Sequence, residues 1–493
     1  MKKLVKAVII TTILGVLTKA ISFLLKVYIS RIIGATALGY YQISVSAFTL
    51  LVTLVTSGLP LVISRRIAKD KTHEAEIVGS GLIVCTLLSV ICTLFVVLFP
   101  GIFTKIWGQN RSLFALYLLL PSVVFSAIYV PIRGSIWGNS RFFTLGIIEL
   151  VEQIIRVIAC VILFNITSSL AGESLTAISY SIACTVSTII AVIIYFAKKG
   201  RVKFTLRQAM PLVKESSPLA VLRVGTSLVA MFISVIVPLM LVKSGLANTE
   251  AVAEFGIVSG MILPLLTIPG TVIGSISVAI LPEISSGSEF VIKRQINKAI
   301  SYSIILSLFL FPIYFNLGSE VGIILYNNAS AGEILKWSSF VMFPLGLSQI
   351  LLSILNALGK ERMTLVISVI GSVFMILPIV LLSNVLGIYS LVLGFGLMSV
   401  TNCTLSLIII RRHLSTEPIK MFVSMLAFCI PACLFAKNIY GICRCLNCGL
   451  LLSVGLSSTI AVSSIGILLL TFKLVDIKSF LPQKLKNKLF KTA

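Results

Sequence analysis

Runs of about twenty apolar residues recur along almost the whole chain, and they constrain the fold more than any other feature. Each run is long enough to cross the hydrocarbon core of a bilayer, which is about 30 Å thick. The apolar residues are continuous rather than alternating with polar ones, which indicates helices and excludes a transmembrane β-barrel. Only 11% of the 493 residues are charged, whereas a soluble chain carries about 25%. We therefore expect an all-α polytopic membrane protein.

The runs and the charges between them predict about fourteen spans. Their approximate limits are 6–29, 38–60, 77–99, 113–133, 142–164, 175–197, 217–242, 252–281, 299–317, 334–356, 363–384, 388–410, 417–436 and 449–472. Lys and Arg gather in alternate connections such as RRIAKDK (65–71) and RRHLSTEPIK (411–420), whereas NITSSLAGES (165–174) contains none. Because cytoplasmic connections collect Lys and Arg, we expect both termini in the cytoplasm. The basic start is interpreted as part of a retained first span rather than a signal peptide, because Lys19 and Lys26 interrupt its apolar stretch.

The net charge of +24 follows from the same asymmetry of the connections and does not indicate nucleic-acid binding. The sequence has no Ser-His-Asp or Cys-His arrangement, no Walker loop and no dinucleotide fingerprint, so we expect neither an enzyme nor a cofactor.

The ten cysteines lie mostly one by one within spans, and only CRCLNC (Cys443, Cys445, Cys448) is clustered. Its spacing favours free thiols or a local disulfide over zinc, and we expect no metal centre.

The chain also repeats itself. GNSRFFTLGIIELV (138–151) resembles GKERMTLVISVIGS (359–372), and each follows a span with an internal proline, Pro121 or Pro344. The repeat predicts an N-terminal six-helix lobe at 1–200 and a C-terminal one at 217–412. An amphipathic cytoplasmic linker at 201–216 joins them, and two appended helices with a basic tail follow at 413–493. Transporters built from such parallel repeats bind substrate between their lobes, so we expect a central cavity there.

Charged residues inside the spans form the candidate site. A Lys or Arg at the centre of a membrane helix costs about 2.5–3.5 kcal/mol on insertion scales, so such residues nearly always face a bundle interior or water. The candidates for substrate binding are Lys19, Lys26, Arg156, Arg223, Glu149 and Glu152. Four cations against two carboxylates predict a net positive chamber, which suits an anionic substrate.

Structural interpretations of the same charges stay open. Glu152 and Arg156 are four residues apart, the spacing at which a Glu and a following Arg meet on a helix. We favour a structural ion pair between them over a direct role in binding. Lys26 and Arg223 lie near enough to span ends to extend their charges to the membrane surface.

Several stretches of the first lobe resemble the polysaccharide-transporter branch of the multidrug/oligosaccharidyl-lipid/polysaccharide exporter superfamily. They are RIIGATALGYYQ (31–42), SGLPLVISRRIAKD (57–70) and RGSIWGNS followed by LVEQIIRV (133–157). The resemblance implies fourteen helices in the bacterial cytoplasmic membrane, with two six-helix lobes whose central cavity opens to each side in turn. It also implies translocation of an undecaprenyl-pyrophosphate-linked saccharide, such as lipid II or a related precursor for spore-cortex peptidoglycan. Lys19 and Arg31 match basic positions of the lipid II flippases of this superfamily, but Leu25 stands where those carry another Arg.

Two other functions stay open. An excess of carboxylates in the cavity would favour a cation-coupled multidrug antiporter of the same superfamily, whereas the excess of cations favours the flippase. A scaffold for envelope assembly would have a cavity without charge selection. We expect the partners to be a lipid-linked saccharide and membrane lipids, with cell-wall synthesis proteins as further candidates and no nucleic acid.

Overall fold

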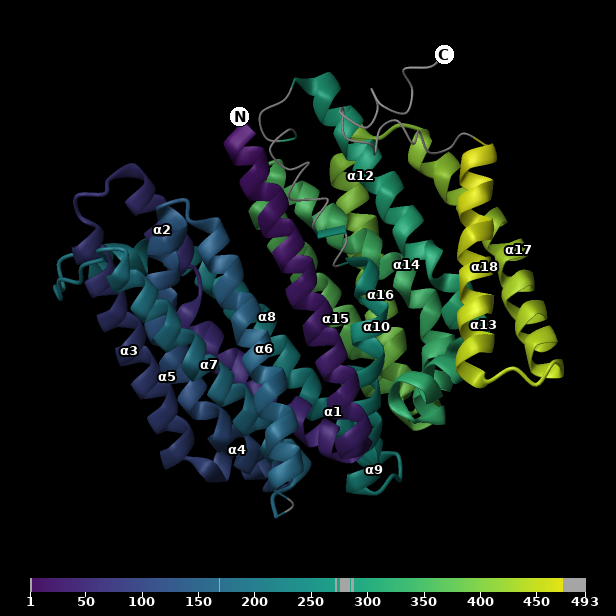
Figure 1. The fold of residues 1–493 in the computed structure, drawn as a ribbon, viewed down its shortest axis with the longest axis horizontal. Helices are drawn as coiled ribbons and strands as arrows, with labels where there is room; N and C mark the ends of the chain where they lie inside the picture. Colours follow the sequence, from purple (N-terminus) through teal and green to yellow (C-terminus); the bar gives the residue numbers. More distant parts are fainter. Residues whose placement is uncertain (1, 168, 271–272, 275–283, 285–287, 473–493) are drawn as a thin grey trace. The chain divides into compact units, whose positions relative to one another are not determined.

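The computed structural model describes residues 2–167, 169–270, 273–274, 284 and 288–472 (Figure 1). All regular secondary structure in these residues is helical, and they contain no strand. The predicted all-α class is therefore confirmed.

The helices group into two compact units. The first comprises Met1–Leu265 and Ser368–Gly394, and the second comprises Leu266–Ile367 and Phe395–Ala493. The first unit contains α1 (Lys2–Thr56), α2 (Leu59–Lys69), α3 (Glu74–Leu98), α4 (Pro100–Trp107), α5 (Arg111–Gly138), α6 (Phe142–Ile166), α7 (Gly172–Ala197), α8 (Ala209–Lys243), α9 (Asn248–Gly256) and a π-helix at Ile257–Ile262. The second contains α12 (Glu289–Phe309), α13 (Phe311–Tyr326), α14 (Ala329–Ala357), α17 (Glu417–Cys445) and α18 (Leu450–Thr471). Residues of α10 (Leu263–Leu266), α15 (Glu361–Leu386) and α16 (Tyr389–Ile410) fall in both units. Packing thus groups the helices differently from the sequence repeat, and the predicted lobes and their limits stay a prediction.

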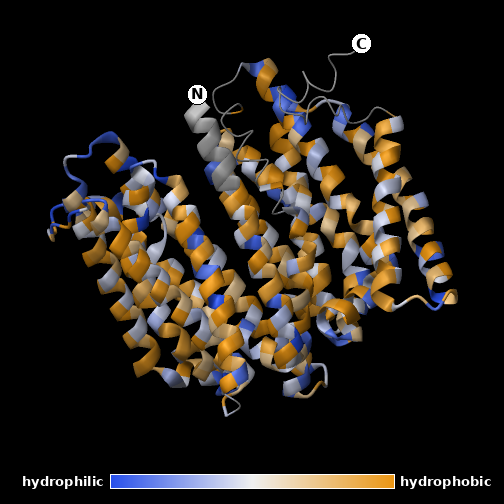
Figure 2. Ribbon diagram, viewed as in Figure 1, coloured by the Kyte–Doolittle hydropathy of each residue, from blue (hydrophilic) through white to orange (hydrophobic). Residues whose placement is uncertain are grey.

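Twelve helical segments among the described residues are long and apolar enough to cross a membrane. The first of them, Ile13–Lys69, contains the second predicted span and the first from Ile13 onward. The helix α6 is not among the twelve, because its 25 residues include three charges. Apolar residues dominate most of the helices in Figure 2. The chain is therefore a multi-pass membrane protein, and the number of fourteen spans stays a prediction.

The long helix α1 is kinked at Gly34, whose φ of 75° and ψ of 176° are not helical. A positive φ of this size is readily adopted only by glycine. Beyond the kink, α9 packs very closely on α1, since a Cβ added at Gly39 would lie 2.1 Å from the carbonyl oxygen of Val252. Small residues at such crossings let membrane helices approach each other. The kink and the close contact together fix the course of α1 through the first unit.

Serine hydroxyls link α1 to its neighbours inside the first unit. Ser44 Oγ donates to the carbonyl oxygen of Ser112 on α5 at 2.7 Å. Ser46 Oγ and Ser234 Oγ, the latter on α8, are 2.5 Å apart. Hydrogen bonds of this kind hold membrane helices together, because lipid offers a polar group no other partner.

Residues of the predicted linker at 201–216 pack against α2 and α3. The guanidinium of Arg66 donates to both carboxylate oxygens of Glu215, at 2.5 and 3.1 Å, and to Gln208 Oε1 at 2.8 Å. These hydrogen bonds lower the pKa of the Glu215 carboxyl below its usual range. The backbone N–H of Lys203 donates to the carbonyl oxygen of Ala75 at 2.9 Å. The segment is therefore held at the ends of α2 and α3.

The two copies of the sequence repeat begin at helix ends of the same form. The N–H of Arg141 donates to the carbonyl oxygen of Ile136 at 3.0 Å, and that of Lys360 donates to Leu355 at 2.9 Å. These hydrogen bonds are separated by 219 residues, whereas the matching letters are separated by 221. The turns therefore correspond in the structure with a shift of two residues.

Candidate functional site

The three charges of α6 lie among α1, α5 and α7 in the first unit. The carboxylate of Glu149 accepts a hydrogen bond from Arg133 Nη2 on α5, at 2.7 Å. Both side chains are half-buried, with 39% of Glu149 and 41% of Arg133 exposed. Because α5 and α6 form a hairpin, residues on either side of its turn are brought face to face. The first charge of the run is thus neutralised within the protein.

The predicted ion pair between Glu152 and Arg156 is wrong. No nitrogen of Arg156 lies within 4.0 Å of a carboxylate oxygen in the described part of the chain. Glu152 Oε2 instead accepts a hydrogen bond from Ser187 Oγ on α7, at 3.2 Å. The guanidinium carbon of Arg156 lies 3.8 Å from the centre of the Tyr180 ring, also on α7. Both side chains therefore contact α7. Arg156 does so because a planar guanidinium stacks well on an aromatic face.

Lys26 on α1 has an exposed side chain whose charge interacts with that of Arg156. One turn earlier, Ser22 Oγ donates to Gln153 Oε1 at 2.8 Å, so this face of α1 packs on α6. The ammonium of Lys26 and the guanidinium of Arg156 repel each other electrostatically. Arg156 also interacts electrostatically with Tyr41, which lies beyond the kink of α1. Neither Lys26 nor Arg156 forms an ion pair within 4.0 Å among the described residues, although the charges of Arg156 and Glu152 also interact with each other.

The remaining candidates, Lys19 on α1 and Arg223 on α8, have exposed side chains in the first unit. No ion pair of either residue occurs within the described ranges. The structure therefore brings four of the six candidates together, namely Lys26, Glu149, Glu152 and Arg156. It adds Lys19 and Arg223 as unpaired cations of the same unit.

Sequence reasoning missed four members of this cluster. Arg133 is the last residue of the predicted span 113–133, but α5 extends past it by more than a turn. Tyr180, Ser187 and Gln153 look like ordinary helix residues in the sequence. Arg133 and Gln153 carried a signal, since they lie in the RGSIWGNS and LVEQIIRV stretches that resemble the exporter family. With Arg133 included, three cations (Lys26, Arg133, Arg156) adjoin two carboxylates.

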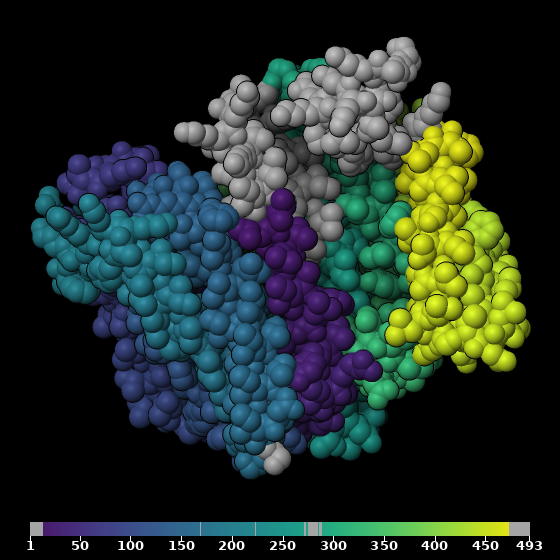
Figure 3. Space-filling view, viewed as in Figure 1, coloured from purple at the N-terminus to yellow at the C-terminus, as the bar shows by residue number. Residues whose placement is uncertain are grey.

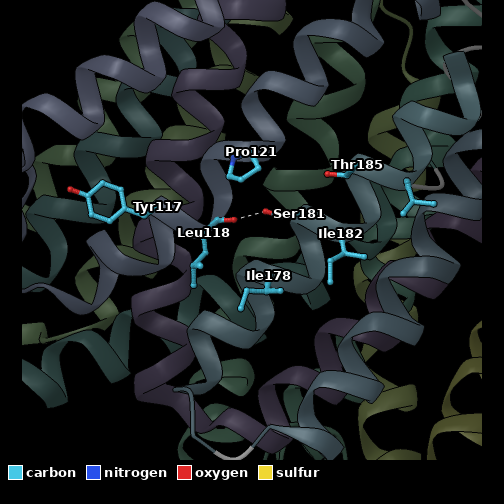
Figure 4. Close-up of a pocket in the computed structure, with 8 residues that line it drawn as sticks. Tyr117, Leu118, Pro121, Ile178, Ser181, Ile182 and Thr185 are labelled. Atoms are coloured by element: carbon cyan, nitrogen blue, oxygen red, sulfur yellow. Dashed lines mark hydrogen bonds between the residues drawn. The ribbon is translucent and has the colours of Figure 1, made fainter.

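A groove between α5 and α7 is different in character. It has a volume of about 390 Å³ and is lined by Tyr117, Leu118, Pro121, Ile178, Ser181, Ile182, Thr185 and Val186 (Figure 4). The hydroxyl of Ser181 donates to the carbonyl oxygen of Leu118 at 2.5 Å across it. None of the lining side chains is charged, so the groove does not suit an ionic ligand.

Within the residues that the structure describes, no group of three His, Cys, Asp or Glu side chains is placed to hold a metal ion. Cys443, Cys445 and Cys448 are in the free thiol form in the structure.

Comparison with known proteins places these features in a family. Residues 4–288 match the polysaccharide biosynthesis protein family. The chain is 27% identical over 398 residues to stage V sporulation protein B of Bacillus subtilis, covering 74% of this chain and 75% of that protein. It is 22% identical over 455 residues to the lipid II flippase MurJ of the same organism, covering 83% of each.

Solved structures give the same fold. The lipid II flippase MurJ in an inward closed conformation has a TM-score of 0.69 and 14% identity, covering 93% of this chain and 98% of that one. The MATE multidrug transporter DinF-BH has a TM-score of 0.63 and 15% identity, covering 83% of this chain and 95% of that one. Flippases and multidrug transporters thus share the fold. The chain belongs to the polysaccharide biosynthesis protein family, and it is similar in sequence to stage V sporulation protein B and to the lipid II flippase MurJ of Bacillus subtilis.

Proposed function

We propose that this chain is a non-enzymatic flippase that moves an undecaprenyl-pyrophosphate-linked saccharide across the bacterial cytoplasmic membrane. We propose lipid II or a related precursor of spore-cortex peptidoglycan as the substrate, since one relative is a lipid II flippase and another is a sporulation protein. The observation that carries the proposal is that the like charges of Lys26 and Arg156 interact in the first unit while neither residue forms an ion pair within 4.0 Å among the described residues.

The electrostatics of the cluster support an anionic ligand. The carboxylate of Glu149 is occupied by Arg133, and that of Glu152 accepts a hydrogen bond from Ser187. Lys26 and Arg156 repel each other until an anion lies between them, so a pyrophosphate would relieve the repulsion on binding. Arginine also matches phosphate oxygens with a planar fork of donors. Lys19 and Arg223 extend the positive charge of the unit.

The mechanism that we propose is alternating access. The head group passes through a polar cavity between two lobes, and the polyprenyl tail stays in lipid. Fourteen spans with both termini in the cytoplasm, and a cavity bounded by the predicted lobes, belong to this proposal. Cell-wall synthesis proteins are the partners that would supply or consume the substrate.

The alternative is a cation-coupled multidrug antiporter, because the MATE multidrug transporter DinF-BH has a similar fold. A cationic drug would be repelled by Lys26 and Arg156, whereas the nearby carboxylates are already engaged. The site therefore favours the flippase.

Purified protein in proteoliposomes separates the two functions. We expect translocation of a fluorescent lipid II and no export of a cationic dye, with empty liposomes as the baseline. Dye transport without movement of lipid II would overturn the proposal and establish the antiporter.

A further inference from the structure

The cysteine cluster CRCLNC lies where α17 ends and the turn to α18 begins, in the second unit. The two helices run side by side at the yellow end of the colour scale in Figure 1, and Figure 3 shows them on the surface of that unit. The proposed transport function assigns no role to these thiols.

The backbone of this turn has a defined form. Asn447 has a φ of 55°, in the left-handed region. The N–H of Cys448 donates to the carbonyl oxygen of Cys443 at 2.9 Å, and the N–H of Asn447 donates to that of Arg444 at 3.1 Å. These two hydrogen bonds, with a left-handed residue between them, are a Schellman motif at the helix end.

The motif places Cys443 and Cys448 within reach of each other. With standard bond lengths, the 2.9 Å hydrogen bond keeps their Cα atoms within about 7 Å. A disulfide needs a Cα separation of about 4.4–6.8 Å. The side chains at these two positions of the motif commonly pack together. Cys443 is buried and Cys448 is half-buried, as a contact beneath the turn requires.

The third cysteine is placed differently. Cys445 follows Cys443 by two residues, which turns it about 200° around the helix. Its side chain is exposed, whereas that of Cys443 is buried. Within the cluster, Cys443 can therefore reach Cys448 and not Cys445, which is left as a free thiol.

The same backbone motif ends other helices without cysteine. Its two positions hold Ile136 and Arg141 at the end of α5, and Leu355 and Lys360 at the end of α14. The paired cysteines are therefore a property of this turn and not a requirement of the motif.

The predicted topology puts the turn outside the cell. The helix α17 has 29 residues, or about 43 Å at 1.5 Å per residue, and so can cross the membrane. It begins at the basic connection RRHLSTEPIK, which is predicted to be cytoplasmic. Its other end would then face the external side, where disulfides persist.

We propose that Cys443 and Cys448 form a disulfide at the external end of α17. The thiolate of one attacks the disulfide of an oxidised protein dithiol and forms a mixed disulfide; the other thiolate then displaces that partner. One S–S bond forms in the chain as one is reduced to two thiols in the partner, and the two protons lost by the cysteines are taken up by its sulfurs. The bond closes a six-residue ring that fixes Asn447 in its left-handed conformation.

The test is mass spectrometry of the full chain from cells lysed in an alkylating agent, digested without reduction. We expect a linked pair of peptides, or a six-residue ring lighter by two hydrogen atoms, joining Cys443 to Cys448, with an alkylated Cys445. The bond should be absent from Cys443→Ser and Cys448→Ser and intact in the matched control Cys445→Ser. Each variant is compared with the parent for yield, so that loss of the bond is separated from loss of the protein.

Two outcomes would overturn the proposal. Alkylation of all three thiols in the parent would show that no bond forms, and a Cys445–Cys448 bond would show that the backbone motif does not select the partner. Neither outcome bears on lipid II transport, so this proposal and the proposed function fail separately.

Discussion

The ion pair between Arg133 and Glu149 gives the most quantitative prediction about the charged cluster. Their atoms are 2.7 Å apart, and about two fifths of each side chain is exposed. Exposed pairs contribute about 0.2–1 kcal/mol, whereas removing one partner of a buried pair costs about 3–5 kcal/mol. This half-buried pair lies between those limits. Glu149→Gln or Arg133→Gln should therefore lower the free energy of unfolding by about 1–3 kcal/mol.

A double-mutant cycle isolates the pair from other effects of each change. The double variant should recover part of the loss, with a coupling energy of about 1–2 kcal/mol. The free energy of unfolding is measured by denaturant titration of the purified protein in detergent micelles. The comparison pair is Glu152→Gln with Arg156→Gln, two charges of the same helix that interact electrostatically but form no ion pair with each other. Its coupling energy should be smaller than that of Arg133 and Glu149.

The reverse pattern would refute the reasoning. If Glu152 and Arg156 couple strongly while Arg133 and Glu149 do not, the sequence spacing would be the better guide to pairing. If neither couples, the ion pair at 2.7 Å would contribute nothing to stability.

Three further predictions follow from the backbone, the aromatic contact and the topology. Gly34→Ala should lower the thermal midpoint, since alanine at a φ of 75° is strained by about 1 kcal/mol or more, whereas Gly15→Ala in the regular part of α1 should not lower it. Tyr180→Leu should destabilise by about 0.5–2 kcal/mol through loss of the Arg156 contact, and Tyr180→Phe should retain most of it. In a cysteine-free background, a Cys at Asn327 should react with an impermeant maleimide in intact cells, and one at Lys199 only after permeabilisation; the opposite result would invert the topology.

The sequence predicted the class of fold and the charged helix well. Continuous apolar runs can only be helices in lipid, so the all-α class follows from composition and length. The charges of α6 were recognised because so apolar a surrounding makes each of them costly. That argument needs no knowledge of neighbouring helices.

The partners of those charges could not be predicted. The spacing of Glu152 and Arg156 permits an ion pair, but which side chain turns to which neighbour depends on α7, where Ser187 and Tyr180 offer other contacts. The predicted span 113–133 ends at Arg133, although α5 extends past it. The sequence of α1 contains no proline that would indicate the kink at Gly34. Pairing across helices is set by tertiary packing, which a single helix pattern does not contain.

The central claim is that the positive charge of Lys26 serves the binding of an anionic head group. Reversing that charge tests the claim most directly. The measurement is the initial rate of lipid II translocation in proteoliposomes at equal amounts of folded protein. Lys26→Arg keeps the charge beside Arg156 and should retain at least partial translocation. Lys26→Glu would pair with Arg156 and occupy the place of the pyrophosphate, so the rate should fall by about tenfold or more, as expected for loss of a hydrogen bond to a charged group. A Lys26→Glu variant that moves lipid II as fast as the parent would contradict the account.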